Sequence, residues 1–401
     1  MKYLKTFILV CLLAFTAFPA IAEDVDFSVD GFGYAITSTT DFTVEVVKGP
    51  DQAVVTVPST VVFNKRTFRV KGIGHGAFSN HVHLESVEMP SITYISNGYF
   101  GQGDGAFCGC KHLSQVNMPS ATSIGDDAFS GCESLTSVSL PAAASIGDYA
   151  FYGCSALASV TLPAATSIGE SAFSDCDALT SVTLPAATSI GESAFSYCAA
   201  LTSVTLPAAT SIGKDAFSNC DALASVTLPA ATSIGYGAFA GCDALTNVSL
   251  PAATSIGFGA FLGCQSLSDI YVGSDPADCN GYSFDNSPFD KVTYATATLH
   301  VPAGCASKYK AADYWKQFNF ISEDYDPTGI KNTNAEKVKV LCENGNVNIT
   351  GLKNGEKVEF YSVSGQLLGV SVANSGAVSF KTSERIVICK MAGASIKVLV
   401  K

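Results

Sequence analysis

One spacing constrains this chain more than any other feature: an aromatic side chain and a cysteine recur together every 22 residues. A phenylalanine stands at eight equally spaced positions, and a cysteine follows each of them three residues later. The phenylalanines are Phe107, Phe129, Phe151, Phe173, Phe195, Phe217, Phe239 and Phe261, and the cysteines are Cys110, Cys132, Cys154, Cys176, Cys198, Cys220, Cys242 and Cys264. A fixed period of about 20 to 50 residues is typical of repeat architectures. The spacing therefore predicts a stack of similar coils.

Each unit reads F-x-x-C-x-x-L-x-x-V-x-L-P-x-A-x-x-I-G-x-x-A from its phenylalanine. The L-x-x-V-x-L spacing predicts a short strand in which Val182 and Leu184 point to the same side, toward a core. Pro185 ends that strand because proline has no N–H group to donate. Gly191 is expected at a sharp turn with a positive φ. The phenylalanine, cysteine and isoleucine of each unit complete the apolar filling.

A single coil cannot bury enough apolar surface to fold alone, so the stack depends on contacts between neighbours and on capped ends. Degenerate units precede the regular array, and in one of them His81 replaces the cysteine. After Cys264 the pattern relaxes. We expect a strand over 297–301 and then a helix over 306–318, with Tyr309 and Trp315 on the face that covers the last coil.

The repeat resembles the BspA-like branch of the leucine-rich repeats. The resemblance rests on the A-F-x-x-C-x-x-L-x-S-V-x-L-P core and on a closing segment that runs from Leu299 to Trp315, and it covers about residues 54 to 322. It implies a β-rich leucine-rich-repeat solenoid and a surface protein that acts in adhesion or in binding host proteins. The general pattern places Asn or Cys where this chain has Ala187, so the curvature of the common horseshoe is not assumed.

The segment after residue 326 differs in kind, because the cysteine period stops and lysine becomes more frequent. Short strands at 338–341, 347–350, 358–363, 367–372, 386–390 and 396–400 predict a small C-terminal β-sandwich. The run Phe360 to Leu367 and the closing Lys397 to Lys401 resemble the sorting domain of type IX secretion. That resemblance implies contact with outer-membrane secretion machinery and removal of the tail. A plain accessory sandwich is the alternative.

The expected organisation begins with an export signal. Lys2 and Lys5, an apolar run and the Ala20-Ile21-Ala22 cleavage pattern predict a signal peptide and a secreted or cell-surface protein. No later stretch is apolar enough for a membrane span. The expected divisions are 1–22 signal peptide, 23–106 N-terminal cap and degenerate repeats, 107–272 regular repeats, 273–325 C-terminal cap of the solenoid, 326–334 linker and 335–401 sandwich. The formal charge of −12 disfavours nucleic acid as a partner.

The cysteines invite a disulfide or metal interpretation, which geometry disfavours for the ladder. Parallel, in-register side chains are spaced too far apart for a disulfide to form easily, and a straight line of thiols cannot surround a metal ion. We therefore expect buried free thiols. In an exported protein, Cys279 with Cys305 and Cys342 with Cys389 are better disulfide candidates. His81 and His83 look metal-like, but His81 is expected to face the core. No cofactor is expected.

The outward side of the predicted strands carries two columns of hydroxyl side chains and contains the candidate binding residues. They are Ser137, Ser139, Ser159, Thr161, Ser181, Thr183, Ser203, Thr205, Ser225, Thr227, Asn247 and Ser249. They form either a solvated sheet face or a recognition face for a glycan or an extended protein chain. The variable N-terminal part, with Tyr94, Tyr99 and Phe100, is the alternative location.

Nucleotide-binding and hydrolase motifs are absent from the sequence, so it predicts no enzyme. The leading hypothesis is an adhesin-like binding protein for an extracellular protein or glycan. The alternatives are a lattice-forming structural protein and a hydroxyl array that orders ice.

Overall fold

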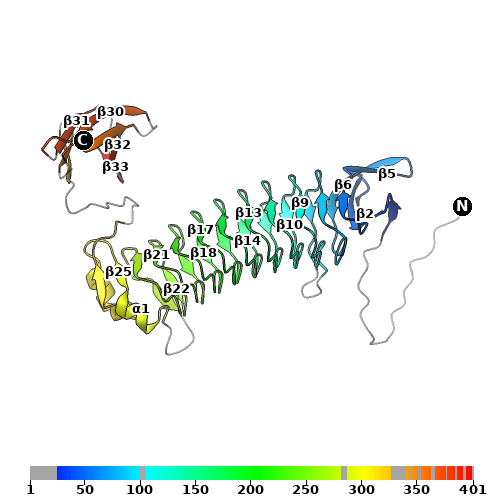
Figure 1. Ribbon diagram of the computed structural model, residues 1–401, viewed down its shortest axis with the longest axis horizontal. Coiled ribbons are helices and arrows are strands. Elements are labelled where there is room, and N and C mark those ends of the chain that lie inside the picture. The colour runs from blue at the N-terminus through cyan, green and yellow to red at the C-terminus, as the bar shows by residue number, and fades with distance from the viewer. Residues whose placement is uncertain are drawn as a thin grey trace. The chain divides into compact units, whose positions relative to one another are not determined.

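The repeated sequence folds into coils with two short strands each, as the computed structural model of the chain shows (Figure 1). The structure describes residues 25–98, 104–280, 287–326, 339–343, 346–350, 352, 354–362, 366–375, 377–383, 386–391 and 394–399. The predicted signal peptide lies outside these ranges. The fold is a β-solenoid with almost no helix, so the predicted fold class is confirmed. The chain divides into two units: one comprises 1–246, 255–267 and 279–290, and the other 247–254, 268–278 and 291–401.

Three antiparallel strands that the sequence did not predict begin the first unit. Strands β1 (Phe27–Val29), β2 (Phe32–Ser38) and β3 (Thr43–Lys48) are antiparallel, and β3 then pairs in parallel with β6 (Arg66–Ile73). Strand β5 (Thr60–Phe63) pairs with β6 in an antiparallel arrangement. Strands β4 (Val54–Thr56), β7 (Ser86–Glu88) and β9 (Gln115–Asn117) form a separate parallel sheet. Strands β1 to β3 cover the edge of β6 that would otherwise be unpaired at the end of the solenoid.

The regular coils each contribute one strand to each of two parallel sheets. The first sheet of this unit contains β11 (Ser137–Ser139), β13 (Ser159–Thr161), β15 (Ser181–Thr183), β17 (Ser203–Thr205) and β19 (Ser225–Thr227). The second contains β8 (Tyr94–Ile95), β10 (Ser123–Ile124), β12 (Ser145–Ile146), β14 (Ser167–Ile168), β16 (Ser189–Ile190), β18 (Ser211–Ile212), β20 (Ser233–Ile234) and β22 (Ser255–Gly257). Neighbouring strands pair 22 residues apart, for example Ser181 with Ser203 and Ile190 with Ile212. The repeat period is thus the strand register.

The core of the first unit is a stack of identical side chains. The rings of the ladder phenylalanines, from Phe78 to Phe289, lie 4.9–5.4 Å apart with interplanar angles of 3–11°. Phe173, Cys176, Leu184 and Ile190 are at most 1% exposed. The inward direction predicted for these positions is therefore confirmed. Every coil buries the apolar side of its neighbour, which is why isolated coils are not stable.

The ladder glycine is required for a reason that the sequence did not reveal. Gly191 does not have the positive φ that we expected; instead, a Cβ on it would lie 2.6 Å from the carbonyl carbon of Gly169 in the preceding coil. The positive φ values occur at Ser193 (53°) and Tyr197 (60°) and at the equivalent positions of other coils. Glycine is thus needed for the close approach of two backbones rather than for a left-handed turn.

The second unit contains the last coils. Strands β21 (Asn247–Leu250), β23 (Asp269–Val272), β25 (Thr298–His300) and β26 (Phe320–Ser322) pair in parallel. Strand β24 (Asp278–Asn280) crosses the boundary between the two units, and helix α1 (Lys291–Thr296) was not predicted. The strand expected over 297–301 corresponds to β25.

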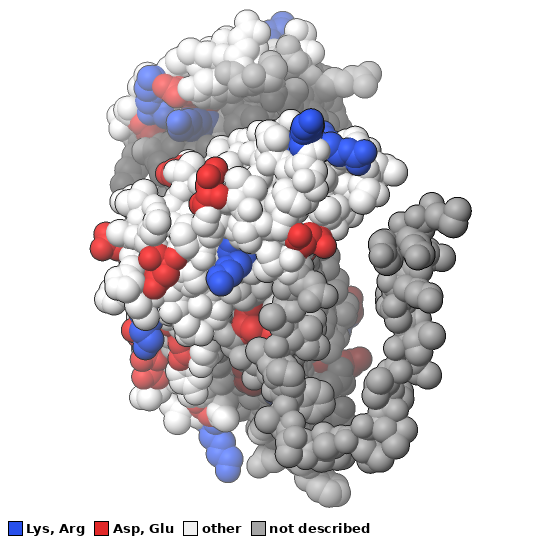
Figure 2. All heavy atoms as spheres, turned by 90° about the vertical axis from the view of Figure 1, so that its right-hand side faces the viewer, with Lys and Arg blue, Asp and Glu red and all other residues white. Residues whose placement is uncertain are grey.

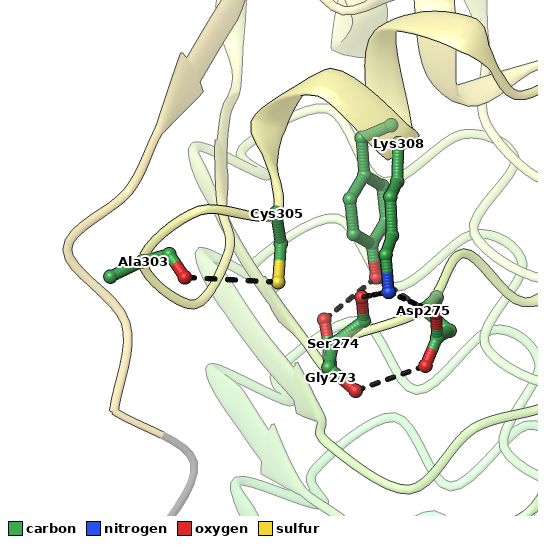
Figure 3. A network of polar contacts seen from close by, with 7 residues as sticks. Gly273, Ser274, Asp275, Ala303, Cys305 and Lys308 are labelled. Atoms are coloured by element: carbon green, nitrogen blue, oxygen red, sulfur yellow. Dashed lines mark hydrogen bonds and ion pairs between the residues drawn. The ribbon is translucent and has the colours of Figure 1, made fainter.

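The helix expected over 306–318 is not continuous. It consists of α2 (Ala306–Ala311) and a 3-10 turn, η1 (Trp315–Gln317), because the chain is extended at Ala312 and left-handed at Tyr314. Its two aromatic side chains are buried as expected: the Tyr309 hydroxyl donates to the carbonyl of Gly273 at 2.9 Å, and the Trp315 ring N–H donates to that of Ala277 at 2.9 Å. Figure 3 shows α2 over the loop at Gly273 to Asp275, where Lys308 pairs with Asp275.

The C-terminal segment of the second unit forms two small antiparallel sheets around one apolar core. One sheet contains β27 (Lys339–Glu343), β28 (Asn346–Thr350) and β31 (Ala377–Lys381), and the other contains β29 (Lys357–Tyr361), β30 (Leu367–Val372), β32 (Ile386–Met391) and β33 (Ala394–Leu399). Six of these strands match predicted segments, whereas β31 was missed. Phe360 of one sheet stacks on Phe380 of the other at 4.1 Å.

Candidate functional site

The predicted hydroxyl columns lie on the outward side of the first sheet. In β11, β13, β15 and β19 the central valine is buried and the residues on either side are exposed; in β17 Val204 is half-buried. Because the strands are parallel and in register, Ser181 lies beside Ser159 and Ser203, and Thr183 beside Thr161 and Thr205. Ten residues from Ser137 to Thr227 are thus arranged as two parallel columns. Asn247 and Ser249, in the second unit, are half-buried.

The hydroxyls of these ten residues have no internal role, unlike those of neighbouring threonine columns. In the coil before β17, the Thr202 hydroxyl donates to the carbonyl of Thr180 at 3.0 Å, and Thr210 beside β18 donates to that of Thr188 at 3.1 Å. Within the described part of the chain, none of the ten column hydroxyls has a hydrogen bond to another protein group. Their donors and acceptors therefore face solvent and are available to a ligand.

The ten column positions between Ser137 and Thr227 carry no charged side chain. Carboxylates occur instead just after the strands of the second sheet, where the carboxylate of Asp126 accepts the backbone N–H of Asp148 at 2.8 Å and that of Asp148 accepts the backbone N–H of Glu170 at 2.7 Å. Burial and the Asp148 carboxylate raise the pKa of Asp126, and the hydrogen bond from the Asp148 backbone offsets only part of this rise. Seen from the N-terminal end of the first unit (Figure 2), acidic and basic side chains are scattered among uncharged ones. Because the ten column residues are themselves uncharged, the face suits an uncharged or weakly charged ligand.

The ladder cysteines lie inside the coils and donate hydrogen bonds between them. The Sγ of Cys198 lies 3.1 Å from the carbonyl oxygen of Phe173, 25 residues earlier, and the same contact recurs along the ladder from Cys132 to Cys264. Burial raises the pKa of Cys154, Cys198 and Cys242 to about 12. These thiols are free, and they remain protonated at physiological pH.

The candidate disulfides receive no support from the structure. Cys305 is a free, buried thiol whose Sγ lies 4.0 Å from the carbonyl oxygen of Ala303 (Figure 3), so the proposed bond from Cys305 to Cys279 is not formed. The segment after Pro302 turns Cys305 toward its own loop. The pairing of Cys342 with Cys389 is untested, because the side chain of Cys342 lies outside the described residues.

The histidines of the N-terminal part serve in local contacts. His81 Nε2 lies 3.1 Å from the carbonyl oxygen of Gly49, and His83 Nδ1 lies 2.9 Å from Asp51 Oδ2. Among the residues that the structure describes, no three His, Cys, Asp or Glu side chains are grouped so as to hold a metal ion. Tyr94 donates its hydroxyl to Glu45 at 3.2 Å. Tyr99 and Phe100, which belong to the alternative location, lie outside the described ranges.

A cluster in the second unit was not anticipated from the sequence. The ring of His300 lies between two carboxylates, with Nε2 2.9 Å from Asp269 and Nδ1 2.7 Å from Asp324. Its face stacks on Tyr271 at 4.4 Å, and Tyr325 packs against Tyr271 at 5.3 Å. Register was the available signal, because Tyr271 and His300 occupy the outward position that Ser249 holds in the preceding strand.

The described helices are all short, and none could cross a membrane. No curated protein matches the sequence.

Solved structures of similar fold come from several bacteria. A leucine-rich cell surface protein from Faecalibacterium prausnitzii is 22% identical, over 75% of this chain and 95% of that one, with a TM-score of 0.38. The leucine-rich repeat protein of T. pallidum is 23% identical over 60% of this chain and 90% of that one, with a TM-score of 0.34. A leucine-rich repeat protein from Bacteroides ovatus is 20% identical over 73% of this chain and 97% of that one, with a TM-score of 0.31.

The family model gives the assignment. The BspA type leucine-rich repeat region matches in six copies, over residues 59–103, 102–211 and 188–308. These matches cover more than half of the sequence and include every coil that carries the hydroxyl columns. The chain belongs to the BspA-type leucine-rich repeat family.

Proposed function

We propose that the protein is an exported, adhesin-like binding scaffold that recognises an extracellular protein or glycan through the outward face of its first sheet. The observation that carries this proposal is the pair of columns between Ser137 and Thr227, which are exposed, in register and without internal hydrogen bonds. Two other threonine columns on the same coils use their hydroxyls to join neighbouring coils. A face that only contacts solvent does not need evenly spaced hydroxyl groups, whereas a ligand with a repeating structure could contact each of them in the same way.

The export signal and the family support a location at the cell surface or outside the cell. The predicted signal peptide accounts for export, and the family resemblance points to bacterial surface proteins. The acidic balance of the chain disfavours nucleic acid and anionic surfaces as partners. We propose no catalytic activity, because the exposed face consists of hydroxyl groups without an adjacent base that could activate them.

A matched pair of lysine variants tests the binding face. The first variant carries Ser181→Lys and Thr205→Lys on the hydroxyl columns. The control carries Ser167→Lys and Ser189→Lys, which are exposed serines of the second sheet. Both variants add the same charge to the same part of the array. The mature chain is tested on immobilised matrix proteins and glycans.

Loss of binding in the first variant alone would support the proposal. Equal retention of a bound ligand by both variants would exclude the hydroxyl columns, and equal loss in both would attribute the effect to charge alone.

A structural role is the second candidate, favoured by the near identity of successive coils. If the protein forms a lattice, the purified chain assembles without any ligand, which sedimentation velocity at increasing concentration detects. A concentration-independent monomer would exclude this role.

We further propose that the C-terminal sandwich is a type IX sorting signal that is removed after export. The resemblance at Phe360 to Leu367 supports this, although Val363, Ser364 and Gly365 lie outside the described residues. Mass spectrometry of the protein recovered from the cell surface tests the proposal. A tail ending at Lys401 in the surface-bound form would contradict it.

A further inference from the structure

The segment that follows strand β26 is held by four separate contacts, one with the start of helix α2 and three with the last coils. The Glu323 carboxylate accepts the backbone N–H of Ala306 at 2.8 Å. Asp324 contacts His300 Nδ1 at 2.7 Å. The backbone N–H of Tyr325 donates to the carbonyl of Val301 at 3.2 Å, and its hydroxyl lies 3.2 Å from that of Ser249. We call residues 323–325 the strap.

The strap covers a part of the sheet that would otherwise be exposed. In the regular coils the outward position is a solvent-facing hydroxyl, as at Thr183. In the second unit the same position holds Ser249, Tyr271 and His300, and Tyr325 lies against the first two of them. The strap is therefore the protein's own occupant of this face, and opening it would uncover an aromatic surface.

The contact between His300 and its two carboxylates requires a proton. A neutral imidazole has one N–H group and one lone pair, whereas the charged form has two N–H groups. Both ring nitrogens of His300 lie within 2.9 Å of a carboxylate oxygen. Only the charged form donates to both. In the neutral form one lone pair faces a negative oxygen, and the side chain, 12% exposed, has little water to separate them.

The two carboxylates are not equivalent, and the difference determines which contact is lost. Asp269 belongs to strand β23 and its side chain is 38% exposed, whereas Asp324 belongs to the strap and is 57% exposed. Asp324 lies beyond the end of β26 and can move into water together with the strap, whereas the backbone of Asp269 is held by pairing with the strands on both sides. When His300 loses its proton, its contact with Asp324 of the strap therefore breaks, and its contact with Asp269 of strand β23 remains.

The titratable groups that face His300 among the described residues come from two elements besides its own strand. Strand β23 contributes Asp269 and Tyr271, and β26 with the strap contributes Ser322, Asp324 and Tyr325. Burial acts to raise the pKa of both Asp269 and Asp324, but hydrogen bonds from Ser268, Ser322 and His300 outweigh it and lower the pKa. Both carboxylates therefore stay charged into the acid range.

We propose that residues 323–325 form a proton-dependent strap: it is closed over Tyr271 and Ser249 while His300 is charged, and it opens when His300 loses its proton. Closure takes up a proton, so by linkage it is favoured at acid pH and weakens as the pH rises. Histidine is the side chain whose charge changes in the physiological range. The strap does not depend on the identity of any ligand, and so it stands apart from the proposed binding function.

Hydrogen exchange of the Tyr325 amide in the mature chain tests this proposal. Exchange is followed by mass spectrometry at about pH 5 and about pH 8, and each rate is divided by the intrinsic rate of an unstructured peptide at that pH. We expect protection of the strap to fall about tenfold between the two conditions, the effect of losing one charged hydrogen bond.

Three variants separate the strap from general stability. His300→Gln keeps a hydrogen-bonding side chain that does not titrate, so the pH dependence should disappear. Asp324→Asn, at an exposed position, should reduce protection at acid pH toward the value that the native protein has at about pH 8. His83→Gln changes a different His–Asp pair, an exposed one in the first unit, and should leave the strap unaffected.

Equal protection of the native strap at both pH values would overturn the proposal, and so would an unchanged pH dependence in His300→Gln. If His300→Gln does not fold, Asp324→Asn decides alone: native-like protection at acid pH would overturn the proposal.

Discussion

Substituting one ladder glycine by alanine tests whether the coils are held at backbone contact. In Gly191→Ala the new methyl group would lie 2.6 Å from the carbonyl carbon of Gly169. Ordinary contact begins at 3.4 Å, so the two coils must separate by close to a further ångström at this edge. The hydrogen bond from the Gly191 N–H to the carbonyl of Ile168, now 2.9 Å, would lengthen as well. Overpacking of this kind destabilises proteins by about 3 kcal/mol.

Gly153→Ala is the matched control, because it adds the same methyl group where nothing lies within 4 Å. Gly153 has a φ of 66°, so alanine there meets only the left-handed strain, about 1 kcal/mol. Tyr197 occupies the equivalent position two coils later. The assay is urea unfolding of the mature chain followed by far-UV circular dichroism. We expect a clearly larger fall in the midpoint for Gly191→Ala. Equal effects, or a larger one for Gly153→Ala, would refute the explanation by close contact.

Two further predictions concern groups inside and outside the coils. Burial raises the pKa of the Cys154, Cys198 and Cys242 thiols to about 12. At about pH 8 a thiol reagent should therefore leave these cysteines unmodified in the native protein and should react completely with the unfolded chain. Rapid modification of Cys198 in the native state would contradict the burial of these thiols. Thr202→Val removes the hydroxyl that donates to Thr180 and should destabilise the protein by about 1 kcal/mol, whereas Thr205→Val should leave the urea midpoint nearly unchanged. A comparable loss for both valine variants would show that the column hydroxyls also have an internal role.

The repeat made most of the solenoid predictable. A period of 22 residues fixes the register, and the alternation around Val182 fixes which residues face the core, because both depend only on spacing. The inward Phe173 and Cys176 and the outward Ser181 and Thr183 all lie where the pattern placed them. The second strand of each coil, from β8 to β20, is only two residues long, which is too short to produce a pattern.

What could not be predicted depends on contacts between residues far apart in the sequence. The role of Gly191 depends on the backbone of Gly169, which only the stacked coils bring close. The break near Tyr314 follows from packing of Trp315 and Tyr309 on the end of the stack. The cluster at His300 includes Asp324, 24 residues later along the chain. The hydroxyl columns remain a predicted binding face.

Strand pairing at a constant offset of 22 residues has a consequence for how such a chain can change. Ser159 meets Ser181 as Ser181 meets Ser203, and Phe151, Phe173 and Phe195 follow one another at 5.1 and 5.2 Å. Removing one whole unit therefore brings together two surfaces that already fit, as does duplicating one. The encoding gene can gain or lose single units by recombination between its repeats, and each product keeps both ends and every internal contact type. Length is thus a property that selection can adjust in steps without first redesigning the core.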